Sequence, residues 1–161
     1  MKKIVIIKDK ILKLSNCIIR NCMENELVNT GKIKYMFENY LKNNELKQVG
    51  PNIVYSSLKF ENDRPQIITS LLVQIENDNK LVLDKPYIFE KEVVVEKCLF
   101  AEFKGNIKYL PLAYQKMEVY AYENDLILKG DKYTVYLMED FSNTVAHVFM
   151  PILAWLYDHL Y

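Results

Sequence analysis

The side chains that could do chemistry are sparse in this sequence. Its two histidines are His147 and His159, and its four glycines stand at predicted turns. The sequence contains no spacing of Ser, His and Asp that is typical of a hydrolytic triad, and no glycine-rich phosphate loop. It also contains no Cys-x-x-Cys pair that would indicate a redox centre or a zinc knuckle. The sequence therefore favours binding over catalysis, and we expect neither a cofactor nor a metal.

The cysteines point to a reducing compartment. Cys17, Cys22 and Cys98 leave one thiol unpaired under any disulfide scheme, so we interpret them as core thiols of a cytoplasmic protein. The apolar start of the chain is interrupted by charges at 8–10, which makes it too short and too polar for a signal peptide or a membrane span. We expect no membrane partner.

The charge balance argues against nucleic acid as a direct partner. Lys plus Arg and Asp plus Glu number 21 each, and the only arginines are Arg20 and Arg64. A balanced charge gives no net field to collect phosphates, and lysine lacks the planar fork that reads guanine or phosphate. We expect no direct nucleic-acid binding.

Tyrosine is the compositional oddity, with twelve in the chain. Phenol rings give flat apolar contact area and hydroxyls that orient a ligand, which suits a concave small-molecule site, although filling of core and surface explains about half of them. Tyr133 and Tyr136 lie three apart on a predicted strand, so they point to opposite faces. Our candidate ligand-binding residues are His147, Tyr114, Tyr133, Tyr136, Phe149 and Trp155.

Two similar halves position these candidates. Apolar spacings of three and four predict one helix in each half, over 33–41 and 110–121. Short apolar or alternating runs predict strands at 16–21, 52–58, 66–75, 93–103, 132–138 and 144–152. The order strand, helix, strand, strand thus recurs at a shift of about 80 residues.

Neither half closes a core alone, because three strands with one helix leave an open sheet edge. We therefore predict an α+β fold in which tandem strand-helix-strand-strand repeats, about 1–80 and 81–161, form a single domain with one curved antiparallel sheet and two main helices.

Motifs of the second half occur together in one known family. A strand leads to Gly105 before the helix, the helix begins Leu-Pro-x-Ala-Tyr at 110–114, Gly130 precedes a Tyr-x-x-Tyr-Leu strand, and the last strand ends in Pro-Ile at 151–152. In these motifs and their order the chain resembles the GyrI-like small-molecule-binding domain, which is also the effector-binding domain of multidrug-sensing bacterial transcription regulators.

The resemblance implies a cleft between two helices and the curved sheet that binds lipophilic and often cationic compounds. In drug-sensing members a buried Glu four residues before the Pro-Ile position meets the cation, and some free-standing members are hydrolases with an acid there. Here that position is His147, and its first-repeat counterpart is Ser70. A neutral imidazole supplies no fixed negative charge, so neither cation preference nor hydrolysis carries over. His147 also fits a half-buried histidine that bonds a neighbour.

The leading hypothesis is a non-catalytic module whose apolar, tyrosine-lined groove binds a lipophilic small molecule. The alternatives are a protein-interaction or accessory module, similar to gyrase-binding or secreted-toxin-locus relatives, and a small hydrolase, which His147 disfavours. The apolar tail at 153–161 carries the only tryptophan. We expect Trp155 to be buried against its own sheet or in a homodimer contact, because its exposure would create an apolar patch.

Overall fold

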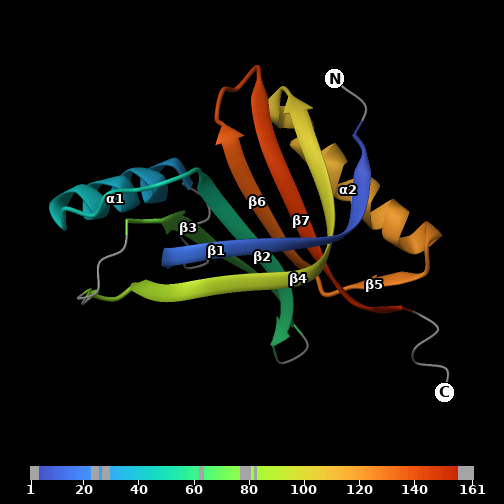
Figure 1. Cartoon of the computed structure of the whole chain (residues 1–161), viewed down its shortest axis with the longest axis horizontal. Coiled ribbons are helices and arrows are strands. Elements are labelled where there is room, and N and C mark those ends of the chain that lie inside the picture. The colour runs from blue at the N-terminus through green and yellow to red at the C-terminus, as the bar shows by residue number, and fades with distance from the viewer. Residues whose placement is uncertain are drawn as a thin grey trace. The chain divides into compact units, whose positions relative to one another are not determined.

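The chain folds into α+β structure (Figure 1). A computed structural model describes residues 4–22, 26, 30–61, 64–76, 81 and 83–155. The elements in chain order are β1 (Ile6–Cys22), α1 (Thr30–Asn43), β2 (Asn52–Glu61), β3 (Arg64–Gln74), β4 (Tyr87–Gly105), the 3-10 helix η2 (Ile107–Tyr109), α2 (Leu110–Glu123), β5 (Leu126–Leu128), β6 (Asp131–Met138) and β7 (Thr144–Trp155). The strand pairings given below are antiparallel. The predicted α+β class with two main helices is therefore confirmed.

Two compact units make up the chain. One is Lys13–Val93, here called the α1 unit, and the other combines Met1–Leu12 with Val94–Tyr161 and is called the α2 unit. Strands β1 and β4 each pass from one unit into the other. Both units contain the order strand, helix, strand, strand, with β5 as an addition in the α2 unit. That the units are superposable repeats of a single domain stays a prediction.

In the α1 unit, β3 pairs with both β1 and β2, and α1 covers one face. Ile33, Phe37 and Leu41 recur every four residues along α1 and are buried, as the spacing predicts for one face of a helix. The core cluster of this unit comprises Ile18, Phe37, Leu41, Val73 and Ile75.

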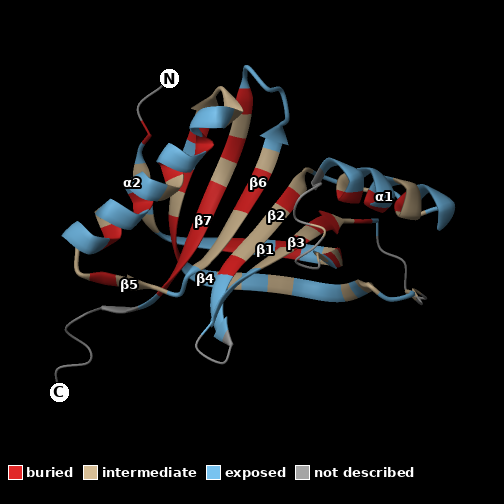
Figure 2. Ribbon diagram, turned by 180° about the vertical axis from the view of Figure 1, so that it is seen from behind, coloured by how far each residue is buried: buried red, intermediate tan, exposed pale blue. Residues whose placement is uncertain are grey.

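In the α2 unit, β7 pairs with β4, β5 and β6. Pro111 stands in the first turn of α2, where its missing N–H leaves no bond unmade. The buried residues of α2 face the strands (Figure 2) and form a core with alternate strand residues, which are Leu99, Ala101, Phe103, Ala146, Val148, Met150 and Ile152. Because side chains alternate along a strand, the residues between these point to the opposite face.

Several strand ends differ from the prediction. Strands β1 and β4 begin at Ile6 and Tyr87, earlier than 16 and 93, because charged residues occupy exposed positions of these strands and hide the apolar alternation. The three-residue β5 is too short to give a pattern, yet it pairs with Ala154 and Trp155 and so extends β7. The Trp155 side chain and residues 156–161 lie outside the described part of the chain, and the expected burial of Trp155 stays a prediction.

Two of the three cysteines lie in the core, as predicted. Cys17 and Cys98 are fully buried, and all three cysteines are free thiols. Burial raises the pKa of both buried thiols to about 11, so little thiolate forms at neutral pH and a nucleophilic role is disfavoured. Within the described ranges, no helix combines the length and apolarity needed to cross a membrane.

Candidate functional site

One sheet face of the α2 unit gathers three of the predicted residues. In the register of β7 with β4, Phe149 lies opposite Phe100 and His147 lies opposite Glu102. In the register of β7 with β6, Phe149 lies opposite Tyr133 and His147 lies opposite Val135. Directly opposed residues share a face, and this face points away from α2. We call it the His147 face; it comprises Phe100, Glu102, Lys104, Tyr133, Val135, Val145, His147 and Phe149.

Aromatic rings form the apolar part of this face. The Phe100 ring lies edge-on to the Phe149 ring with 5.1 Å between centroids, and edge-on to the His147 ring with 5.0 Å between centroids. Phe149 and Val135 are buried, whereas the His147 side chain is 30% exposed. Such edge-to-face pairs fix ring orientation, which gives a rigid apolar surface with one polar group at its boundary.

A row of hydrogen-bonded charges borders the rings. Glu102 Oε1 accepts from Lys104 Nζ at 2.8 Å, and Glu102 Oε2 lies 3.3 Å from His147 Nε2. The bonds from Lys104 and then His147 lower the pKa of Glu102, which therefore stays ionised. A carboxylate only accepts, so Nε2 of His147 is the donor, and Nδ1 of the neutral ring is left as an acceptor.

A cavity of about 510 Å³ opens at the end of this face. Its lining includes Lys104 and Val145 of the His147 face, together with Gly105, Asn106, Tyr109, Met138, Ser142, Asn143 and Thr144. The volume falls within the range of small-molecule pockets. Lys104 lines the cavity and is also hydrogen-bonded to Glu102, so it joins the cavity to the polar row.

The remaining candidates lie elsewhere. Tyr136 packs against the core under α2, and its pKa is raised by burial. Tyr114, on α2, shares a 2.9 Å hydrogen bond between its Oη and Thr134 Oγ1 on the same side of the sheet. The structure therefore brings His147, Phe149 and Tyr133 together and places these two tyrosines on the opposite face. Trp155 is known only by its backbone pairing with Leu126.

Sequence reasoning missed the β4 part of the site. No sequence pattern marks Phe100, Glu102 or Lys104 as site residues. Only the register of β4 against β7 reveals that Glu102 opposes His147. The first-repeat counterpart Ser70 is buried in the α1 unit and donates to Asn21 Oδ1 at 2.7 Å. Across the described residues, no group of three or more His, Cys, Asp or Glu side chains could hold a metal ion.

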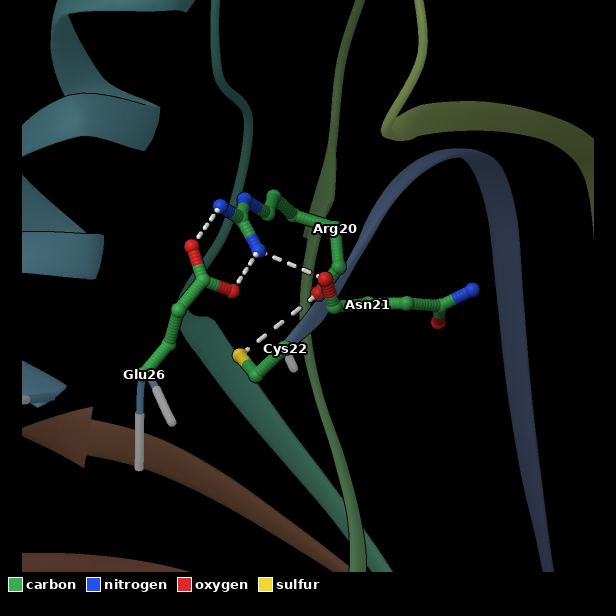
Figure 3. Close-up of polar contacts among 4 residues, drawn as sticks. All are labelled: Arg20, Asn21, Cys22 and Glu26. Carbon is green, nitrogen blue, oxygen red and sulfur yellow. Dashed lines mark hydrogen bonds and ion pairs between the residues drawn. The ribbon is translucent and has the colours of Figure 1, made fainter. Parts of the chain in front are cut away.

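A second polar cluster lies in the α1 unit (Figure 3). Arg20 is 3% exposed, and its Nη1 and Nη2 donate to Glu26 Oε2 and Oε1 at 2.8 and 2.6 Å. Nη1 also donates to the Asn21 carbonyl at 2.6 Å, while Nε is buried and has no hydrogen-bond partner among the described residues. The bidentate pair ties Glu26 to β1, so we interpret it as a structural cross-link.

The comparisons with known proteins show the fold. No protein-family model matches the sequence, and no curated protein is significantly similar to it. Among solved structures, the C-terminal domain of EcmrR matches with a TM-score of 0.60 at 13% identity, covering 89% of this chain and 96% of that domain. SAV2435 bound to tetraphenylphosphonium matches with a TM-score of 0.53 at 8% identity, covering 96% of this chain and 98% of that one. The GyrI-like resemblance is confirmed at the level of fold.

EcmrR in its DNA complex matches with a TM-score of 0.61 at 13% identity, covering 89% of this chain. This chain spans 56% of that EcmrR chain. The expectation that the present chain makes no direct contact with nucleic acid therefore stays a prediction.

Proposed function

We propose that this chain is a non-catalytic module that binds a lipophilic small molecule on the His147 face. The observation that carries the proposal is the edge-on arrangement of Phe100 against Phe149 and His147, beside a cavity of about 510 Å³. The likeness in fold to SAV2435, whose structure holds tetraphenylphosphonium, supports it.

The site offers binding groups but lacks the parts of a catalytic centre. The half-buried Phe100, which Phe149 holds edge-on, supplies apolar area, and Nδ1 of His147 supplies a hydrogen-bond acceptor that orients a ligand. Tyr133 is the tyrosine candidate that belongs to this face, so the groove of the proposal is aromatic rather than tyrosine-lined. Three free thiols support a reducing, cytoplasmic location.

Thermal unfolding tests the proposal. A lipophilic ligand at about 100 times its Kd adds about 2.7 kcal/mol to the free energy of unfolding, because it binds the native state alone. His147→Ala is expected to weaken binding about tenfold, since it removes both the acceptor and an edge contact of Phe100.

The matched control is Gln115→Ala, at an exposed position of α2, which should bind like the wild type. Equal loss of affinity in both variants, or a midpoint that no lipophilic compound raises, would refute the proposed site.

A further inference from the structure

The charges of the His147 face narrow the class of ligand, an inference that rests on the proposed function. We infer that Lys104 is a specificity-determining residue that disfavours lipophilic cations, so that the site prefers lipophilic molecules without positive charge. The observation behind it is that Glu102, the carboxylate that lies directly opposite His147, already accepts hydrogen bonds from side chains of the protein.

Both oxygens of this carboxylate already have a donor. Lys104 Nζ lies 2.8 Å from Oε1, and His147 Nε2 lies 3.3 Å from Oε2. A ligand cation that reached Glu102 would lie beside the Lys104 ammonium, a like charge that repels it.

Lys104 lies at the cavity end of the His147 face. Lys104 and Glu102 are two apart on β4, so their side chains leave the same face of the strand. Lys104 also lines the cavity of about 510 Å³, while Phe100 lies on the other side of Glu102. A ligand that spans the cavity and the rings passes the ammonium, which favours an anion and tolerates an uncharged molecule.

Isosteric ions of opposite charge provide the test. Calorimetric titration of the full chain with tetraphenylborate and with tetraphenylphosphonium at low salt separates charge from shape. The wild type should bind tetraphenylborate about fivefold more tightly, the scale of one partly exposed ion pair. Lys104→Met should reverse this order by exposing the Glu102 carboxylate, and Lys104→Met with Glu102→Gln should abolish the gain in cation affinity.

Lys132→Met is the matched control. Lys132 also pairs with a partly exposed carboxylate, Glu118, at 2.7 Å, but it lies 5.4 Å from the ring centroid of Tyr114 on α2. This variant carries the same change in net charge and should keep the wild-type preference.

Tighter binding of tetraphenylphosphonium by the wild type, or equal effects of Lys104→Met and Lys132→Met, would overturn the role of Lys104 and leave the proposed function standing. If neither ion binds the wild type or the Lys104→Met variant, both the role of Lys104 and the proposed function are overturned.

Discussion

Phe103→Ala is expected to lower the free energy of unfolding by about 4 kcal/mol, the usual scale for removing a buried aromatic ring. Phe103 is fully buried in the core under α2, among Ala113, Met117 and Val148. The cavity that alanine leaves cannot close, because these neighbours are held by a helix and a strand. Urea denaturation followed by circular dichroism measures the loss.

Phe100→Ala is the matched variant, three residues away on the opposite face of β4. Phe100 is half-buried, so its loss should cost only about 1–2 kcal/mol of stability, while binding of a lipophilic ligand weakens at least about tenfold. Phe103→Ala, once corrected for its unfolded fraction, should bind almost normally. A Phe103→Ala variant that loses as much affinity as Phe100→Ala would place the ligand on the α2 side of the sheet.

Arg20→Met is expected to lower the free energy of unfolding by about 3 kcal/mol, because the Glu26 carboxylate loses its bidentate partner in a largely buried place. The buried Nε of Arg20 has no hydrogen-bond partner in the described part of the chain, so the native pair is itself imperfect there. Replacing both residues, as Arg20→Met with Glu26→Leu, should recover most of the loss, since apolar side chains of similar volume need no partner.

Urea midpoints of the two single variants and the double variant form the cycle that measures this coupling. Glu26→Leu alone should be at least as damaging as Arg20→Met, because it leaves the more deeply buried charge unpaired. A double variant less stable than either single variant would contradict the interpretation of Arg20 and Glu26 as a cross-link that apolar contacts can replace.

Local sequence patterns predict the helices well. Ile33, Phe37 and Leu41 define α1, and Leu110, Ala113 and Met117 define α2, because burial of one helix face imposes a spacing visible in a single segment. The early parts of β1 and β4 show no such apolar spacing. Their exposed positions carry lysines, aspartate and glutamates, which conceal the apolar alternation of the strands.

The candidate site was predicted only along β7 and β6. His147 comes from the resemblance of the last strand to the GyrI-like pattern, and Tyr133 from the abundance of tyrosine. Glu102 and Lys104 could not be found this way, because their roles depend on the register of β4 against β7, a pairing between residues 45 apart for Glu102 and His147. The spacing of three between Tyr133 and Tyr136 correctly predicts that they lie on opposite faces of β6.

The central claim is that the His147 face of the α2 unit holds the ligand, and methyl NMR tests it most directly. Val135 lies on this face opposite His147, whereas Val148 belongs to the core under α2. Titration with tetraphenylborate should shift the Val135 methyl signals strongly through the ring currents of the bound phenyl groups and leave those of Val148 nearly unchanged. Saturable shifts at Val148 with none at Val135 would contradict the account.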